Sequence, residues 1–410
     1  MNGDNLFLGT LQLLQPPWSV CNQLRVVLRS ESSFAPKRVL VLAKMSRYEF
    51  EKMRAPHLDE CTLKMKILER GSDYDAMLAS YNAIQLAVQY TTKALKELNV
   101  EYNVSNRTQV KQSQFDWADL IFPIGGDGTF LLASNLIFNS KKPIVGINPD
   151  PGSSEGFLML HPKYSQNVPE IFYRLRNGQF KYLLRNRIRI KLQGDNIWGE
   201  AFHVHKQSRV AGPERIEVDS GEVKPTKDAK LPNERRLPWL ALNEVFIGES
   251  LPARASTLLV KVDEDDDKFL KVKSSGICLS TGTGSTSWHT AINRLTPQVV
   301  KEILTLADPG GVFTDEEARR VCEAFNESLR FSPEDSRLSY SVRDMIIPKN
   351  APKMGFLQRR GFCRTLTLRS QSNDTDLVLD GCTGIPFNNG SLAILESDPE
   401  DALRSIILPE

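Results

Sequence analysis

The stretch from Trp117 to Phe138, WADLIFPIGGDGTFLLASNLIF, constrains the fold of this chain more than any other. Its first part is mostly apolar and ends at Ile124, which is typical of a buried strand in a parallel sheet. The sequence GGDGT, Gly125 to Thr129, follows at once, and the apolar residues after it recur at helical spacing. The order is therefore strand, glycine turn and helix.

The glycine turn has a chemical consequence. Free backbone N–H groups at a helix N-terminus form an anion site, and Gly125, Gly126 and Gly128 would let a phosphate approach the backbone closely. Asp127 would repel a phosphate, so we expect it to bind Mg²⁺ or to take a proton from an attacking hydroxyl. A plain β-turn is the alternative. The loop matches neither the P-loop pattern nor G-x-G-x-x-G.

The elements around this loop predict an N-terminal domain with a doubly wound open α/β sheet over residues 36–184. Ligands of such sheets bind beyond the carboxyl ends of the strands, where Asp127 and Asn148 fall. The expected elements are strands at Lys37–Lys44, Val100–Val104 and Pro143–Asn148 and a long amphipathic helix at Met77–Leu98.

From residue 185 onward the pattern predicts a β-rich, sandwich-like domain over 185–390. Arg187–Leu192 alternates strictly, as in a half-solvated antiparallel strand. We expect a mobile insertion at 205–238, helices at 298–330, and a C-terminal tail, 391–410, that returns to the first domain. Further strand-like runs occur at Trp239–Ile247, Thr257–Val262, Phe269–Lys273, Thr365–Arg369 and Asp376–Leu379.

Three further stretches carry polar groups in unusual settings. Thr281 to Thr286 holds four hydroxyl side chains and two glycines, which suit a polar ligand, although a linker would look similar. Asn243 and Glu244 lie inside the apolar run WLALNEVFI, and buried polar groups must either pair within the protein or bind a ligand. Asp380 ends a strand-like run, where a simple turn is the default reading.

Composition excludes several classes of function. Lys+Arg of 52 against Asp+Glu of 50 gives a net charge of +2, so there is no bulk electrostatic case for nucleic acid. No apolar run reaches about 18 residues, so no membrane insertion is expected. The six cysteines are scattered without a C-x-x-C pair, which predicts free thiols and no metal site.

Residues 1–35 do not read as part of a fold. They contain arginine and serine but no acidic residue between Asp4 and Glu31. This composition is typical of a mitochondrial transit peptide, and a disordered N-terminus is the alternative.

Taken together, these stretches resemble the NAD kinase family, most closely its mitochondrial type. The loop GGDGT alone is shared with diacylglycerol and sphingosine kinases, so a lipid kinase is the alternative, and a nucleotide sensor without turnover is a second one. Gly282 stands where a proline is usual in the family, and Trp288 where a tyrosine is usual. The matching pieces are Gly125–Thr129, Gly146–Leu158, Asn243-Glu244, Thr281–Thr286 and Leu379–Gly381, in the family's order over residues 37–410.

The resemblance implies an active site in the cleft between the two domains. Mg²⁺-bound ATP would give its γ-phosphoryl group to the 2′-hydroxyl of the adenosine ribose of NAD, and Asp127 would accept the proton. The GGDGT backbone would hold phosphates, whereas Asn243 and Glu244 would hold the dinucleotide. The protein itself would supply no dedicated metal site. It would act as a dimer or larger homo-oligomer in the mitochondrial matrix. The implied binding residues are Gly125, Gly126, Gly128, Thr129, Asn148, Asn243, Glu244, Thr281, Gly282, Thr283, Gly284, Ser285, Thr286 and Asp380.

Overall fold

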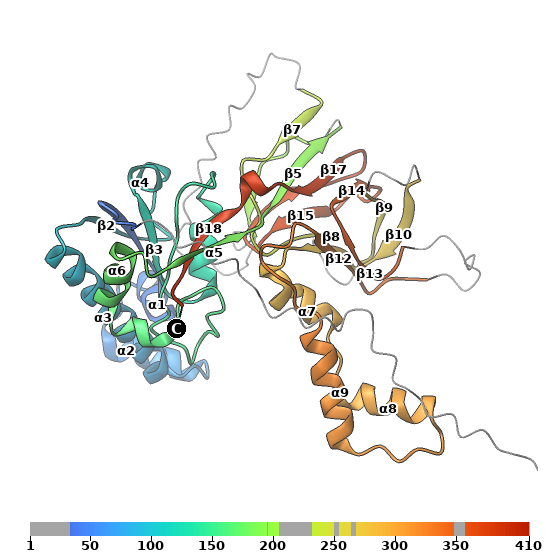
Figure 1. Ribbon diagram of the computed structural model, residues 1–410, viewed down its shortest axis with the longest axis horizontal. Helices are drawn as coiled ribbons and strands as arrows, with labels where there is room; N and C mark the ends of the chain where they lie inside the picture. The colour runs from blue at the N-terminus through green and yellow to red at the C-terminus, as the bar shows by residue number, and fades with distance from the viewer. Residues whose placement is uncertain are drawn as a thin grey trace, which may run out of the picture.

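The computed structural model describes residues 33–194, 196–204, 232–249, 254–263, 268–347 and 357–409. Most of the expected transit segment 1–35 and of the expected insertion 205–238 lies outside the described residues. The described parts form an α/β domain and a β-rich domain side by side, with a helical arm below the β-rich domain (Figure 1).

The α/β domain contains a parallel sheet with the strand order β2-β1-β3. Beyond β3, the segment predicted as a strand at 143–148 makes only single bridges, at Ile144 and Ile147. The elements of this domain are β1 (Arg38–Ala43), α1 (Arg47–Arg54), α2 (Glu60–Glu69), α3 (Tyr74–Glu97), β2 (Glu101–Asn106), α4 (Gln112–Trp117), β3 (Leu120–Ile124), α5 (Asp127–Asn135), η1 (Pro162–Ser165), α6 (Val168–Arg176), β4 (Lys181–Arg185) and β18 (Leu403–Ile407).

Helices cover both faces of this sheet because successive side chains on a strand point to opposite sides. Val39 and Val41 of β1 pack in one core with α3 and α6. Leu40 and Leu42 of the same strand pack in a second core with α4 and α5. The predicted doubly wound α/β domain is therefore confirmed.

The β-rich domain is a sandwich of two sheets, as predicted. Val260 and Leu395 of one sheet and Val245 and Ile277 of the other belong to a single buried core. One sheet has the order β10-β9-β14-β17-β5-β7 and the other β13-β12-β11-β8-β15-β16-β6. The strands are β5 (Ile188–Gln193), β6 (Phe202–His203), β7 (Glu234–Arg236), β8 (Glu244–Glu249), β9 (Ser256–Val262), β10 (Leu270–Ser274), β11 (Gly276–Ser280), β12 (Leu338–Arg343), β13 (Arg360–Cys363), β14 (Thr365–Ser370), β15 (Thr375–Leu379), β16 (Thr383–Pro386) and β17 (Leu392–Ser397).

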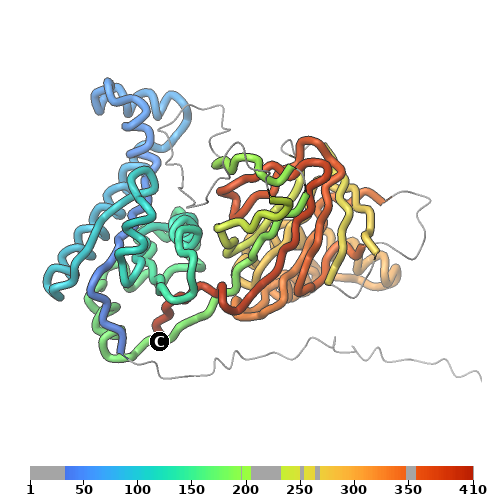
Figure 2. The backbone as a smooth tube through the Cα atoms, turned by 90° about the horizontal axis from the view of Figure 1, so that it is seen from above, coloured from blue at the N-terminus to red at the C-terminus, as the bar shows by residue number. Residues whose placement is uncertain are grey.

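Two chain crossings join the domains. The first runs from β4 into β5, and the second runs from β17 through η4 (Pro399–Asp401) into β18. Because β4 and β18 pair with each other, the two crossings lie together, as the green and red segments of Figure 2 show. The expected C-terminal tail is thus divided, since β17 pairs with β14 and β5 in the β-rich domain and only β18 returns to the α/β domain.

Arg187 occupies the first crossing and differs from the sequence-based expectation. The alternation of Arg187–Leu192 suggested a strand with its arginines in solvent, yet the Arg187 side chain is completely buried. Its guanidinium donates to the backbone carbonyls of Asp401 and Ile137 at 2.6 and 2.5 Å, and to those of Ser134 and Asn139 at longer range. It therefore ties the crossing to the α/β domain, because Ser134 lies in α5 and Ile137 follows its C-terminal end.

The boundaries of two expected segments also shift. The N–H of Phe34 donates to the Leu175 carbonyl at 2.9 Å, and its ring lies 6.4 Å from that of Phe180. Phe34 therefore packs with the α/β domain. At the end of the expected insertion, Glu234–Arg236 forms the edge strand β7, which pairs with β5.

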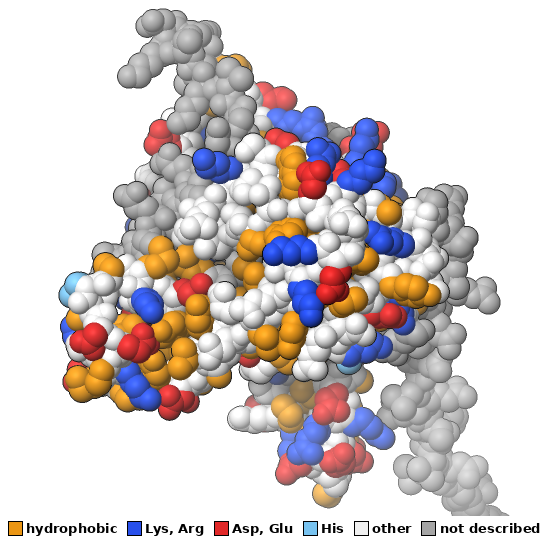
Figure 3. Space-filling model, turned by 90° about the vertical axis from the view of Figure 1, so that its left-hand side faces the viewer, with side chains coloured by type: hydrophobic (Ala, Val, Ile, Leu, Met, Phe, Trp, Pro, Cys, Tyr) orange, Lys and Arg blue, Asp and Glu red, His pale blue; other side chains and the backbone are white. Residues whose placement is uncertain are grey.

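The helical arm consists of α8 (Pro297–Ala307) and α9 (Asp315–Glu327), preceded by η3 (Thr283–Thr286) and α7 (Trp288–Asn293). It extends away from the sandwich (Figure 1) and accounts for the helices predicted at 298–330. On the face of the molecule drawn in Figure 3, basic and acidic side chains are interspersed. Within the described ranges, no helix combines the length and the apolar character that crossing a membrane requires.

Candidate functional site

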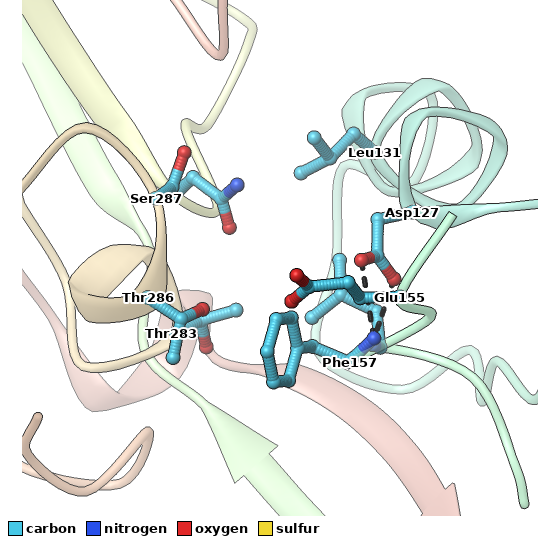
Figure 4. Close-up of a pocket in the computed structure, with 9 residues that line it drawn as sticks. Asp127, Leu131, Glu155, Phe157, Thr283, Thr286 and Ser287 are labelled. Atoms are coloured by element: carbon cyan, nitrogen blue, oxygen red, sulfur yellow. Dashed lines mark hydrogen bonds between the residues drawn. The ribbon is translucent and has the colours of Figure 1, made fainter. Parts of the chain in front are cut away.

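A cleft of about 300 Å³ lies between the two domains. One wall comes from α5 and the segment after Asn148, and the other from the start of β8 and from η3 (Figure 4). In Figure 4, Glu155 and Phe157 reach from the α/β side towards Thr283 and Thr286. The lining residues are Asp127, Leu131, Glu155, Phe157, Leu158, Asn243, Thr283, Thr286 and Ser287.

The glycine turn places Asp127 at the first position of α5. Gly125 has a φ of 155°, and a Cβ there would lie 2.5 Å from the Thr129 hydroxyl. A Cβ on Gly126 would lie 2.4 Å from the Ser154 hydroxyl, whereas a Cβ on Gly128 would have no atom of the described residues within 4 Å. Gly125 and Gly126 are therefore required by close packing, and Gly128 leaves open space beside the helix N-terminus.

The Asp127 carboxylate is held by the loop after Asn148, which belongs to the same wall of the cleft. It accepts the backbone N–H groups of Leu158 and Phe157 at 2.8 and 3.1 Å, drawn as dashed lines in Figure 4. These two N–H donors fix the orientation of the carboxylate at the first turn of α5. The structure thus fixes a carboxylate oxygen pair at the edge of the cleft.

Asn148 shapes the loop that carries Phe157 and Leu158. Its side-chain amide donates to the Ser154 carbonyl at 2.9 Å, and its carbonyl oxygen accepts the Asp150 N–H at 3.1 Å. Asn148 was predicted to bind a ligand, but its side chain is occupied within its own loop and does not line the cleft.

Asp380 sets the geometry of the opposite wall. Its carboxylate accepts the backbone N–H groups of Leu242, Asn243 and Glu244 at 2.9, 2.8 and 3.1 Å. These contacts end the extended run, so the strand predicted at 239–247 begins only at Glu244, as β8. Asp380 acts here by holding the backbone beneath Asn243 and Glu244, and it does not line the cleft.

Asn243 and Glu244 each carry a buried oxygen that has no partner among the described residues. For Asn243 it is the side-chain carbonyl oxygen, which belongs to the cleft lining, and for Glu244 it is Oε2. A buried polar atom without a partner destabilises the fold by about 1–3 kcal/mol. One unpartnered acceptor in the cleft lining, with a second on the next residue, therefore indicates a ligand that brings hydrogen-bond donors.

The protonation states of Glu244 and Asp380 are linked. Burial, and then the charge of Asp380, raise the pKa of Glu244 to about 8, although hydrogen bonds from Ser287 and from the Trp288 N–H oppose the rise. Burial raises the pKa of Asp380 to about 6 against its three backbone donors. Because these donors and Arg187 stabilise a charge on Asp380, it carries the charge at pH 7 and Glu244 carries a proton.

The hydroxyl-rich stretch divides into residues that build the turn and residues that face the cleft. Thr281 Oγ1 donates to the Leu242 carbonyl at 2.6 Å and accepts the Gly284 N–H at 3.1 Å. The Ser285 hydroxyl donates to the Gly282 carbonyl at 2.6 Å. Only Thr283 and Thr286 of this stretch line the cleft.

Close packing explains both glycines of this turn. A Cβ on Gly284 would lie 2.1 Å from the backbone carbonyl oxygen of Asn243, and a Cβ on Gly282 would lie 1.8 Å from the backbone carbonyl oxygen of Ser332. Residues 332–335 follow the helical arm directly. The return of the arm therefore occupies the space that a proline at position 282 would need.

The structure brings Asp127, Asn243, Thr283 and Thr286 together, as the sequence predicted, and adds residues that the prediction missed. Phe157 and Leu158 belong to the segment Gly146–Leu158, which carried the family resemblance, and Ser287 directly follows the hydroxyl run. The sequence therefore contained a signal for each of these positions. Leu131 lies one helical turn after Asp127. The other predicted binding residues support the walls without lining the cleft: Gly125, Gly126, Gly128, Thr129, Asn148, Glu244, Thr281, Gly282, Gly284, Ser285 and Asp380.

No protein-family model matches the chain. A crystal structure of yeast NADH kinase complexed with NADH superposes with a TM-score of 0.49 at 13% identity and covers 91% of this chain and 84% of that chain.

Two relatives match over nearly their full length. "NAD kinase 2, mitochondrial" of Rattus norvegicus is 35% identical over 394 residues, which cover 93% of this chain and 90% of that protein. The protein of the same name from Homo sapiens is 34% identical over 395 residues, which cover 93% of this chain and 86% of that protein. At this identity and coverage, the chain belongs to the NAD kinase family.

Proposed function

We propose that the chain is a phosphotransferase that moves the γ-phosphoryl group of Mg²⁺-bound ATP to the 2′-hydroxyl of the adenosine ribose of NAD, which yields NADP. The observation that carries this proposal is that the Asp127 carboxylate lies across one cleft from the side-chain carbonyl oxygen of Asn243, which has no partner among the described residues. A lipid kinase is not supported, because the relatives that span the chain are NAD kinases.

Asp127 acts as the general base. Its carboxylate is fixed by the N–H groups of Phe157 and Leu158, so it can accept the hydroxyl proton without reorienting. The ribose oxygen then forms a bond to the γ-phosphorus, and the bond between that phosphorus and the bridging oxygen breaks with its electron pair leaving on ADP. Positioning and charge neutralisation supply most of the acceleration in such transfers.

Asn243 and Glu244 bind the dinucleotide. The side-chain carbonyl oxygen of Asn243 and Glu244 Oε2 are buried acceptors without partners among the described residues, and ribose hydroxyls and the adenine amino group are donors. A donor that reaches Glu244 favours its ionised form, so nucleotide binding would release the proton that Glu244 holds at pH 7.

The phosphates of ATP are placed at the N-terminus of α5. Gly128 leaves open space there, and the free N–H groups of the first turn favour an anion. Thr283 and Thr286 face this position from the β-rich wall. The apolar side chains of Leu131 and Phe157 offer surfaces for a nucleotide base.

The residues of the cleft fit a magnesium ion that arrives with ATP. Mg²⁺ is usually held by substrate phosphates, waters and one or two carboxylates. The cleft lining contains two carboxylates, Asp127 and Glu155, and the described ranges hold no group of three or more His, Cys, Asp or Glu side chains placed for a metal. The ion would neutralise phosphate charge during the transfer.

The cellular setting is also part of the proposal. Both relatives are named as mitochondrial proteins, and residues 1–32 precede the described fold. We place the chain in the mitochondrial matrix, with residues 1–32 as its transit peptide, and we expect a homodimer. Light scattering on the purified protein, and its co-fractionation with mitochondria, test these statements.

The direct test incubates purified full-length protein with Mg²⁺-ATP and either NAD, NADH or diacylglycerol, and identifies the product by mass spectrometry. The expected product carries one added phosphate on the adenosine ribose, and omission of the divalent cation abolishes it. Asp127→Asn serves as the control for a contaminating kinase. Phosphorylation of diacylglycerol alone, or no phosphorylation of either nucleotide, would refute the proposal.

A further inference from the structure

Two buried arginines lie two residues apart in the first domain crossing and differ sharply in their partners. Arg187 is completely buried, and its guanidinium donates to four backbone carbonyls. Arg185 has 7% of its surface exposed, and Nη1 makes one long hydrogen bond of 3.4 Å to the Thr283 hydroxyl. Its Nε is buried and has no partner in the part of the chain that the structure describes.

Arg185 also lacks an ion pair within the described ranges. Burial lowers the pKa of Arg185 to about 10, and the charges of Asp127 and Glu334 oppose this fall. Neither carboxylate comes within ion-pair distance, and no other described carboxylate does. A buried charge without a close partner is strongly destabilising unless something compensates it. The fold thus holds a desolvated cation with unused donors beside Thr283.

Arg185 contacts a residue of the cleft in which the proposed phosphoryl transfer takes place. Thr283 lines the cleft, so the guanidinium lies directly behind the wall that faces Asp127. The guanidinium fork matches phosphoryl oxygens, and its hydrogen bonds to an anion are about twice as strong as neutral ones.

We infer that Arg185 and Thr283 form an anion subsite that binds the phosphoryl group as it reaches the ribose, and that the same subsite holds the 2′-phosphate of the product. The inference rests on the proposed function, since it specifies which residues contact the transferred group. The unused N–H donors of Arg185 then contact phosphoryl oxygens, and the Thr283 hydroxyl turns from Arg185 to the same group.

This assignment predicts different effects on the affinities for NAD and NADP. NAD and NADP differ only in the 2′-phosphate, so a subsite for that phosphate contributes to NADP affinity and not to NAD affinity. A structural role of Arg185 as a support for the crossing would instead alter stability and affect both nucleotides alike.

The experiment compares Arg185→Met and Arg185→Lys with Arg187→Met in the full-length protein. Calorimetry gives the dissociation constants of NAD and NADP, and thermal melting with and without inorganic tripolyphosphate gives the anion response. Arg185→Met should weaken NADP binding by about tenfold or more while NAD binding changes little. Arg185→Lys should fall between it and the wild type, because it keeps the charge and loses the fork.

Arg187→Met provides the matched control, since it also removes a buried guanidinium from the same segment. It should lower the melting temperature clearly and leave the ratio of the two dissociation constants unchanged. Arg185→Met should melt at or above the wild-type temperature, because it removes an uncompensated buried charge.

Three outcomes would overturn the inference. They are an unchanged ratio of NADP to NAD affinity in a folded Arg185→Met, a melting temperature that falls as in Arg187→Met with that ratio intact, and the failure of both Arg185 variants to fold. The tripolyphosphate measurement separates this inference from the proposed function. If the wild type does not phosphorylate NAD but tripolyphosphate stabilises it and not Arg185→Met, the subsite stands and the proposed function fails.

Discussion

The carboxylate of Asp127 accepts the backbone N–H of Leu158, 31 residues further along the chain, at 2.8 Å. This bond joins the glycine turn to the loop that follows Asn148, so the wall of the cleft is one connected unit. The second carboxylate oxygen accepts the N–H of Phe157. Since both bonds go to backbone donors, each oxygen keeps a lone pair for a substrate proton.

Asp127→Asn should therefore fold but turn over slowly. Loss of a general base usually reduces kcat by about 10²- to 10⁴-fold. An amide offers only one acceptor oxygen, so one of the two backbone N–H bonds is lost as well, at about 1 kcal/mol of unfolding free energy. Steady-state kinetics and thermal melting measure the two effects.

Asp150 provides the comparison for Asp127. Its carboxylate accepts hydrogen bonds from the hydroxyls of Ser80 and Ser153 and does not line the cleft. Asp150→Asn should lower stability slightly and change kcat far less than Asp127→Asn. Equal kcat values for Asp127→Asn and the wild type would remove Asp127 from the chemistry.

Glu244 should make stability depend on pH. Its folded-state pKa of about 8 lies above the ordinary value of 4.5, so the folded protein holds a proton that the unfolded chain releases. The free energy of unfolding therefore falls as the pH rises from about 4.5 to about 8. Glu244→Gln should remove part of the fall between pH 6 and pH 8, where Asp380 is already ionised. The same pH dependence of unfolding free energy in the wild type and in Glu244→Gln would contradict a raised pKa for Glu244.

Glu244 should also govern the affinity for NAD. Glu244→Ala should raise KM for NAD by about tenfold or more, since a hydrogen bond to a charged group contributes roughly 1.5–3 kcal/mol. KM for ATP should move far less. A lower melting temperature with both KM values unchanged would show that Glu244 only supports the fold.

The glycines of the two turns should respond to alanine in opposite ways. Gly282→Ala should lower the melting temperature strongly, because the new Cβ would lie 1.8 Å from the Ser332 oxygen. Gly128→Ala meets nothing within 4 Å and lies in a helix, where alanine is favoured by about 1 kcal/mol, so stability should hold or rise. Its kcat/KM for ATP should nevertheless fall if phosphates approach that backbone.

Two truncations should separate the N-terminal segment from the fold. Removal of residues 1–32 should leave the melting temperature and activity unchanged and abolish mitochondrial import. Removal of residues 1–35 should also lower the melting temperature by a few degrees. This truncation deletes Phe34, and with it the hydrogen bond to Leu175 and the ring contact with Phe180. Import of either truncated chain would argue against a transit peptide.

Local pattern was sufficient for much of the α/β domain. A buried apolar run, a glycine turn and a helical repeat are all readable within 22 consecutive residues, so β3, the turn and α5 follow from Trp117 to Phe138 directly. The series of strand-like runs after residue 185 also predicted the β-rich, sandwich-like domain. The helices α1 and α2 were not predicted, although Ser46 and Asp59 cap them through Glu49 and Thr62.

The sequence by itself determined which residue types occur at the site, and only the tertiary structure decided what each of them does. Asp127 and Asp380 are both carboxylates beside glycine, yet one faces the cleft and the other holds the backbone of Leu242 to Glu244. Arg185 and Arg187 are both buried and lie two residues apart, yet only Arg187 donates to four carbonyls. These differences depend on atoms far away in the chain, such as Thr283 and Asp401, because a hydrogen bond is decided by three-dimensional position and not by sequence neighbours.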